Sequence, residues 1–191
     1  MLEKKGIISI IIIAVVLVLG FVIFNSNSNN SGSSGSTPNE AIKEEKIIAG
    51  NWIDFELTDI RTGEKFKISD LNNKPVLLES FAVWCPTCTR QQREIKKLHE
   101  EVGDDVISIS LDTDPNEDES RVLEHIKRND FNWHYAIAPI EMTQSLINQF
   151  GIGIVNAPSA PVVLICNNEA RKLDSGVKSV GELKEEIEKG C

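Results

Sequence analysis

A short apolar strand that runs directly into two cysteines, and from them into a helix, restricts the folds open to this chain. Residues 76–83 favour a buried β-strand, and Cys-Pro-Thr-Cys at residues 85–88 follows after one tryptophan. Over residues 88–102 the apolar side chains recur at helical spacing. Pro86 suits the first helical position, where its missing N–H costs nothing. The sequence therefore predicts two thiols at a helix N-terminus that follows a strand.

This placement favours redox chemistry at Cys85 and Cys88. Unpaired backbone N–H groups and the helix dipole stabilise a thiolate, which is the species that attacks a disulfide. Cys85 precedes the first turn and is the predicted nucleophile, whereas Cys88 is predicted to resolve the mixed disulfide. A zinc site is the alternative, but zinc usually takes four ligands. Because the other cysteines and the histidines are scattered singly, we predict no metal site.

Residues 1–24 are predicted to be a transmembrane anchor. Residues 7–24 carry no charge and would form a helix of about 27 Å, which can span a bilayer. Lys4 and Lys5 precede this run, so the N-terminus should be cytoplasmic and the catalytic domain of this single-pass protein extracytoplasmic. A cleaved signal peptide is the alternative, although no Ala-x-Ala-like site follows. Residues 25–46 are predicted to be a flexible Asn/Ser/Gly linker with a short lead-in.

Residues 47–191 are predicted to form one α/β domain. Alternating residues at 53–68, around a turn at 61–64, predict an N-terminal β-hairpin. Further strands are expected at 76–81, 106–111, 133–137, 161–166 and 171–173, and helices at 88–102, 117–129, 142–150 and 180–189. This order predicts a mixed central sheet with flanking helices, parallel at the centre and antiparallel at an edge. With 29 acidic and 20 basic side chains, the chain is not expected to bind nucleic acid.

Residues 51–88, which end in Trp-Cys-Pro-Thr-Cys, and the apolar segment that begins at Pro161 resemble the membrane-anchored thioredoxin-like thiol-disulfide oxidoreductases of the TlpA/ResA kind. The resemblance covers about residues 50–190. It implies a thioredoxin-like fold, a redox-active Cys85–Cys88 disulfide without a further cofactor, and protein thiols or disulfides as substrates. It also implies reductive work such as cytochrome c maturation, with a membrane electron donor of the thioredoxin or CcdA/DsbD type.

The same resemblance implies a substrate-binding surface. It makes Pro161 a cis-proline beside the dithiol, with the backbone of Ala160 pairing with a substrate chain; Pro158 is the other candidate. Proline is the first residue between these cysteines, whereas the family commonly has it second, so the redox direction stays open. Ala160 is smaller than the threonine or isoleucine of many relatives. Trp84 shields the dithiol by resemblance, and a plain packing role is its alternative. The substrate-binding residues are then Trp84, Pro86, Thr87, Ala160 and Pro161.

Glu79 is unusual because a charged, unpaired carboxylate in a buried strand costs several kcal/mol. It lies six residues before Cys85, the spacing at which thioredoxins keep a buried aspartate that exchanges a proton with the resolving cysteine. Burial would raise its pKa toward neutrality, so Glu79 is predicted to be a general acid/base for Cys88. Strand alternation that turns Glu79 to a polar face is the alternative.

Cys166 and Cys191 are a possible structural disulfide. In the thioredoxin arrangement both fall at the end of the sheet away from the dithiol, where a bond would stabilise the domain by about 3 kcal/mol. A buried free thiol and a frayed C-terminal cysteine are the alternative.

Two other functions are open on this fold. A cysteine-based, peroxiredoxin-like peroxidase would need a Pro-x-x-x-Thr-x-x-Cys pattern, which neither active-site cysteine has. A copper chaperone would need a histidine near the cysteine pair, and His134 is its candidate.

Overall fold

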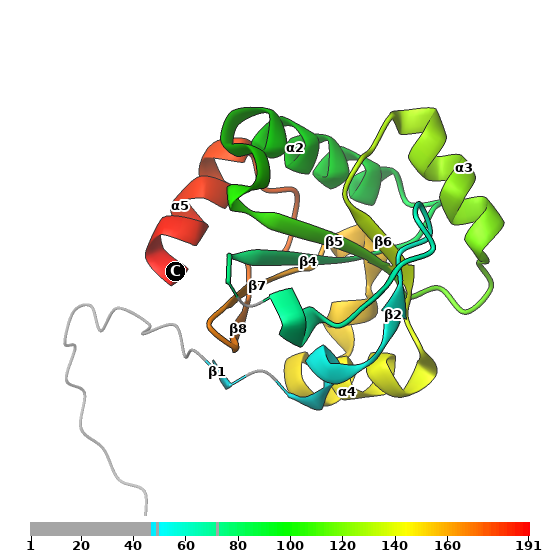
Figure 1. Ribbon diagram of the computed structural model, residues 1–191, viewed down its shortest axis with the longest axis horizontal. Helices are drawn as coiled ribbons and strands as arrows, with labels where there is room; N and C mark the ends of the chain where they lie inside the picture. Colours follow the sequence, from blue (N-terminus) through cyan, green and yellow to red (C-terminus); the bar gives the residue numbers. More distant parts are fainter. Residues whose placement is uncertain (1–46, 49, 72) are drawn as a thin grey trace, which may run out of the picture. The chain divides into compact units, whose positions relative to one another are not determined.

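The computed structural model describes residues 47–48, 50–71 and 73–191 of the chain (Figure 1). The predicted anchor, residues 1–24, and the predicted linker, residues 25–46, lie outside the described residues. Within the described ranges, no helix is both long and apolar enough to cross a membrane. The anchor, the linker and the domain boundaries therefore stay predictions.

A mixed sheet organises the described chain, with the strand order β1-β8-β7-β4-β5-β6. Its strands are β1 Ile47–Ile48, β4 Val76–Phe81, β5 Ile107–Asp112, β6 His134–Ile137, β7 Val162–Cys166 and β8 Glu169–Lys172. Strands β4, β5 and β6 are parallel. On the other side of β4, β7 pairs antiparallel with β4, β8 with β7, and β1 with β8. Parallel strands end at a common edge, so the loops that follow β4 and β5 lie close together. The predicted mixed sheet is confirmed.

Helices cover both faces of this sheet (Figure 1). They are α2 Pro86–Val102, α3 Glu119–Asn129, α4 Ile140–Phe150 and α5 Val180–Gly190. Alternation along β4 divides it between two cores. Leu77 and Phe81 pack into the core formed with α2, α3 and α5, whereas Val76 and Leu78 pack into the core formed with α4. The odd-numbered residues of β4, which share a face with Leu77 and Phe81, therefore point toward α2, the helix that carries the dithiol.

The predicted N-terminal hairpin is present but shorter than the alternating pattern suggested. Its strands are β2 Leu57–Thr58 and β3 Lys65–Phe66, which form a separate two-stranded sheet. The preceding Asn51–Asp54 is a 3-10 helix (η1) and not a strand. Trp52 explains the difference, because it is fully buried, donates from Nε1 to Gln149 Oε1 at 2.6 Å and packs edge-on against Phe150. Those partners lie on α4, far away in the sequence.

The structure joins Cys166, the last residue of β7, to Cys191, which follows α5. Their Cα atoms are 5.4 Å apart, a usual separation for a disulfide. They meet because β7 runs away from the dithiol, β8 returns toward it, and α5 runs away again. The pairing stays a prediction for the protein in solution, where a thiol count tests it.

Candidate active site

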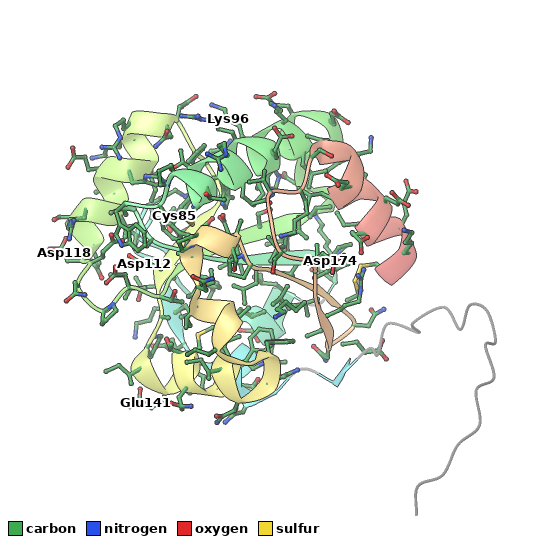
Figure 2. The ribbon with its side chains drawn as sticks, turned by 180° about the vertical axis from the view of Figure 1, so that it is seen from behind. Cys85, Lys96, Asp112, Asp118, Glu141 and Asp174 are labelled. Carbon is green, nitrogen blue, oxygen red and sulfur yellow. A yellow bond between two sulfur atoms is a disulfide. The ribbon has the colours of Figure 1, made fainter. Side chains whose placement is uncertain are left out.

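Cys85 is the N-cap of α2, and Pro86 begins the helix, as the sequence predicted. An N-cap side chain accepts a hydrogen bond from an N–H of the first turn. Here Cys88 N–H donates to Cys85 Sγ at 3.1 Å. The sulfur therefore lies where helix N–H groups have no intrahelical partner, and these groups stabilise negative charge on it when the disulfide is reduced. Figure 2 shows Cys85 at this junction among its neighbouring side chains.

Cys88 has the opposite surroundings. The two cysteines form a disulfide in the structure, and Cys88 Sγ lies 3.1 Å from the carbonyl oxygen of Ala157. Ala157 begins the 3-10 segment Ala157–Ser159 (η5), just before β7. In the reduced protein this oxygen accepts a hydrogen bond from the Cys88 thiol, which stabilises the protonated form. The backbone thus favours a thiolate at Cys85 and a thiol at Cys88. Exposure does not separate the two residues, which are 1% and 0% exposed.

Glu79 lies on β4, fully buried, on the face that packs against α2. The alternative that it faces a polar surface is therefore wrong. Ser110 Oγ donates a hydrogen bond to Glu79 Oε2 at 3.0 Å. Burial raises the pKa of Glu79 to about 8, against the lowering effects of Gln92, Ser110 and the charge of Lys178. A carboxyl group with this pKa can accept and donate a proton near neutral pH.

Sequence reasoning missed the buried polar residues around Glu79. Gln92, one turn after Cys88 on α2, is fully buried, and its Oε1 lies 2.7 Å from His125 Nε2. Burial lowers the pKa of His125 to about 4, so its ring is neutral at neutral pH and Nε2–H donates to the amide oxygen. This hydrogen bond fixes the Gln92 amide. The amide is near enough to lower the pKa of Glu79. In the described structure, however, no hydrogen bond of good geometry joins Gln92 Nε2 to Glu79 Oε1. The available signal was a glutamine on the apolar face of the helix.

Trp84 borders an open cleft beside the dithiol. It is 56% exposed, and its Nε1 donates to Asp114 Oδ2 at 2.6 Å. The cleft has a volume of about 380 Å³, and its lining includes Trp84, Asp114, Ala157 and Pro158. In the first turn of α2, Pro86 is exposed and Thr87 is half-buried. The structure thus brings the predicted substrate-binding residues before and between the cysteines to one accessible surface.

Carboxyl groups of the loop after β5 tie that loop to the active-site loop. Glu117 Oε2 accepts a hydrogen bond from Val83 N–H at 2.8 Å, beside the bond from Trp84 to Asp114. Asp112 ends β5 and pairs in register with the last residue of β4. Burial raises the pKa of Asp112 to about 8, and the hydrogen bond and negative charge of Glu117 act in the same direction. This loop therefore fixes the backbone that leads into Cys85.

The structure corrects the prediction of a cis-proline at Pro161. All described peptide bonds are trans, including the one between Ala160 and Pro161. The chain instead turns at Ala160, whose φ of 45° and ψ of 59° lie in the left-handed region. Ala160 N–H donates to Ala157 O at 2.9 Å, and its carbonyl accepts from Lys178 Nζ at 2.7 Å. The two backbone groups expected to pair with a substrate are therefore engaged within the protein, and both Ala160 and Pro161 are buried.

The described residues contain no group of three or more His, Cys, Asp or Glu side chains that could hold a metal ion. His134, the candidate copper ligand, lies at the start of β6, and its Nδ1 is 3.0 Å from Asp59 Oδ2. The dithiol follows the C-terminal end of β4, whereas His134 begins the parallel strand β6. The structure therefore does not bring His134 to the cysteine pair.

Solved structures of low sequence identity share this fold. A secreted Mycobacterium tuberculosis disulfide oxidoreductase homologous to E. coli DsbE matches with a TM-score of 0.55 and 16% identity, over 74% of this chain and 99% of that one. A thiol:disulfide interchange protein of the thioredoxin family from Chlorobium tepidum TLS matches with a TM-score of 0.59 and 15% identity, over 76% and 96%. The exposed lipoprotein thioredoxin Etrx1 of Streptococcus pneumoniae strain TIGR4 matches with a TM-score of 0.57 and 18% identity, over 71% and 98%. These matches confirm the thioredoxin-like fold.

Sequence comparison gives the family. The thiol-disulfide oxidoreductase ResA of Bacillus thuringiensis (strain Al Hakam) is 27% identical over 116 residues, which is 59% of this chain and 62% of the relative. ResA of Bacillus anthracis gives the same values. The chain thus spans less than two thirds of the length of these curated relatives. The model of the Redoxin family matches residues 49–184, a range that contains the dithiol, Glu79 and most of the described sheet. The chain belongs to the Redoxin family.

Proposed function

We propose that this Redoxin-family chain is a thiol-disulfide oxidoreductase that exchanges disulfides with protein substrates through Cys85 and Cys88. The observation that carries the proposal is the contrast between the two sulfurs. Cys85 Sγ accepts a helix N–H, whereas Cys88 Sγ faces a carbonyl oxygen. The first environment favours a nucleophilic thiolate and the second a protonated thiol. The names of the ResA relatives support the same activity.

In the reducing direction, the Cys85 thiolate attacks one sulfur of a substrate disulfide. A Cys85–substrate mixed disulfide forms, and the other substrate sulfur leaves as a thiolate that takes a proton from solvent. Cys88 then loses its proton to the carboxylate of Glu79, attacks Cys85 Sγ, and releases the second substrate thiolate. Two electrons pass to the substrate, and the protein is left with the Cys85–Cys88 disulfide. The oxidising direction is the reverse of these steps.

Glu79 is the proposed proton acceptor because its surroundings suit that step. It is buried on the face of β4 that packs against α2, and it interacts with Gln92, one helical turn after Cys88. A pKa of about 8 leaves a fraction of the carboxyl groups ionised at neutral pH. The protonated form can then return the proton to solvent or to the leaving substrate thiolate.

The proposed docking surface for the substrate is the cleft beside Trp84. The indole offers an apolar, exposed face, while Pro86 and Thr87 flank the disulfide. Ala160 and Pro161 do not line this cleft, and their carbonyl groups accept hydrogen bonds within the protein, from Lys178 Nζ and from Ser80 N–H respectively. A substrate chain would pair with Ala160 itself only after the internal hydrogen bonds of that residue open.

The proposed setting is extracytoplasmic, with residues 1–24 as a single-pass anchor. The apolar run at 7–24 behind two lysines supports it, as do the solved relatives described as secreted or as an exposed lipoprotein. In this setting a membrane donor of the thioredoxin or CcdA/DsbD type would supply electrons, and cytochrome c maturation is the proposed use. A single cysteine introduced in place of a serine of residues 25–38, in Cys85→Ser/Cys88→Ser protein, tests the orientation: a membrane-impermeant thiol reagent should label it in intact cells, and labelling only after lysis would refute the proposed orientation.

Trapping tests the chemistry. We expect the protein to accelerate reduction of insulin by dithiothreitol, and the Cys88→Ser variant to accumulate a mixed disulfide with insulin. The Cys85→Ser variant should accumulate none. Trapping through Cys88 in that variant would reverse the assignment of the two cysteines. Absence of both acceleration and trapping, with peroxide consumption in their place, would favour the peroxidase function.

A further inference from the structure

Lys178 is a buried lysine beside the dithiol site. It lies in the segment between β8 and α5, and it is 7% exposed. Its Nζ donates to the carbonyl oxygen of Ala160 at 2.7 Å. Lysine is almost never so buried unless it is paired, because removing an ammonium group from water is costly. Here the hydrogen-bond partner is a backbone carbonyl of the turn before β7. The role of Lys178 therefore depends on what that turn contacts.

The backbone of Lys178 is fixed to the helix that carries the dithiol. Gln91 lies on α2 in the turn after Cys88 and is fully buried. Lys178 N–H donates to Gln91 Oε1 at 2.7 Å, and Gln91 Nε2 donates to Lys178 O at 3.2 Å. Both hydrogen-bonding groups of the amide are therefore used to hold one residue 87 positions away. The lysine is placed by α2 and not by its own segment alone.

The turn that Lys178 holds is the one that faces Cys88. Ala160 N–H donates to Ala157 O at 2.9 Å, and that same oxygen lies 3.1 Å from Cys88 Sγ. The contacts form a closed circuit through Cys88, Gln91, Lys178, Ala160 and Ala157. Ala160 also has a φ of 45°, a conformation that costs a non-glycine residue energy. The ammonium group anchors the turn at this residue.

Lys178 also lies close to the strand segment that contains Glu79. The turn that it holds at Ala160 leads directly into β7, where Val162 pairs in register with Glu79. The charge of Lys178 lowers the pKa of Glu79, and the charge of Glu79 in turn raises the pKa of Lys178. Two other carboxylates act on Lys178, Asp174 from its own segment and Glu182 from α5. Burial outweighs all three and lowers the pKa of Lys178 to about 8. Asp174 and Glu182 are exposed, and Glu182 accepts hydrogen bonds from Ser179 at the start of α5, so Glu79 is the buried carboxyl group among the three.

We propose that Lys178 is a positioning residue of the dithiol site: it fixes the Ala157–Ala160 turn against Cys88 and supplies the positive charge that keeps Glu79 able to ionise. The proposal rests on the proposed function, because it assigns Lys178 to the proton transfer of that reaction. Lys178 does not touch the reacting sulfurs. It acts through Ala160 and Ala157 on Cys88, and through its charge on Glu79.

The test replaces Lys178 by methionine, which has a similar length but neither a charge nor a donor. Lys127→Met is the matched control, since Lys127 is an exposed residue of α3. Glu79 is titrated in the oxidised protein by carboxyl NMR, with Glu79→Gln identifying its resonance. We expect Lys178→Met to raise the pKa of Glu79 by about one unit, because removal of a positive charge disfavours the carboxylate. The amide of Ala160 should also exchange its hydrogen faster than in the control.

Activity gives a separate readout. The midpoint of the rise of the disulfide-reduction rate with pH should move upward in Lys178→Met with the pKa of Glu79, and the rate at pH 7 should fall about tenfold. Because the NMR titration uses oxidised protein, it does not depend on catalysis. A shifted Glu79 in a protein that reduces no disulfide would support Lys178 and refute the proposed function. An unshifted Glu79 and an unchanged Ala160 amide in an active protein would overturn the proposal for Lys178 alone.

A reciprocal measurement covers the case in which Lys178→Met does not fold. Coupling between two titrating groups is mutual, so Glu79→Gln should lower the pKa of Lys178, followed through its labelled side-chain nitrogen. If the pKa of Lys178 stays the same in folded Glu79→Gln protein, the coupling between the two groups is refuted.

Discussion

Replacing Glu79 by glutamine should remove a large pH dependence from the stability of the fold. Glutamine keeps the size of the side chain and an oxygen that can accept from Ser110, but it cannot ionise. In the native protein burial raises the pKa of Glu79 from 4.5 to about 8. Between these two values the folded state holds a proton that the unfolded state has released. The free energy of unfolding of the wild type therefore falls as pH rises through this window.

The magnitude follows from the shift in pKa. At about 1.36 kcal/mol per unit, complete ionisation of Glu79 above pH 8 costs the folded state about 5 kcal/mol relative to acidic solution. The same relation places about 2 to 3 kcal/mol of that loss between pH 5 and pH 7. Any contact that glutamine fails to make with Gln92 or Ser110 changes the stability of the variant by the same amount at every pH. The diagnostic quantity is therefore the slope with pH, not the offset.

Urea unfolding of the oxidised protein at pH 5, 6 and 7 measures this slope. No reductant is present, so the unfolded states of wild type and variant carry the same crosslinks. The stability of the wild type should fall relative to Glu79→Gln by about 2 to 3 kcal/mol between pH 5 and pH 7. Glu124→Gln, at an exposed position of α3, is the control and should follow the wild type. Parallel curves for wild type and Glu79→Gln would show that Glu79 does not retain its proton in the folded protein, and the proposed proton transfer would lose its basis.

Three further outcomes are expected. Cys85→Ser/Cys88→Ser protein should show no free thiol when it is denatured without reductant, because we expect Cys166 and Cys191 to be bonded in solution as they are in the structure. Two thiols in a monomer would refute the bond, whose loss should cost about 3 kcal/mol. Trp84→Ala should raise KM for insulin severalfold and leave the reaction with a small disulfide unchanged; equal losses on both would point to a packing role. Asp112→Asn should make the protein more stable at pH 9 than the wild type, with a smaller gain at pH 5, because Asp112 holds its proton up to about pH 8; a constant difference in thermal midpoint would argue against ionisation of Asp112.

Local sequence signals predicted the dithiol and its helix well. Pro86 marks the helix start, the apolar run marks β4, and together they place Cys85 at the N-cap. Glu79 could be found because a carboxyl group inside an apolar strand is conspicuous. Each of these inferences uses neighbours within a few residues.

Long-range polar pairs left no such signal. Gln91 and Lys178 are 87 residues apart, and neither stands out in the sequence. The length of the N-terminal hairpin was misjudged for the same reason, because Trp52 is held by Gln149 from α4. The cis-proline was expected from resemblance alone, whereas the peptide geometry at Pro161 follows from how η5 turns at Ala160.

A Cys166–Cys191 bond, as the structure has it, would change how the chain transmits force. It closes a covalent ring that contains β8, the segment with Lys178, and α5. Tension applied between the two ends of the chain passes from Cys166 through the sulfurs to Cys191, and it bypasses residues 167–190. Lys178, which holds the turn next to Cys88, therefore lies in a part of the chain that would bear no tension until the Cys166–Cys191 bond is reduced.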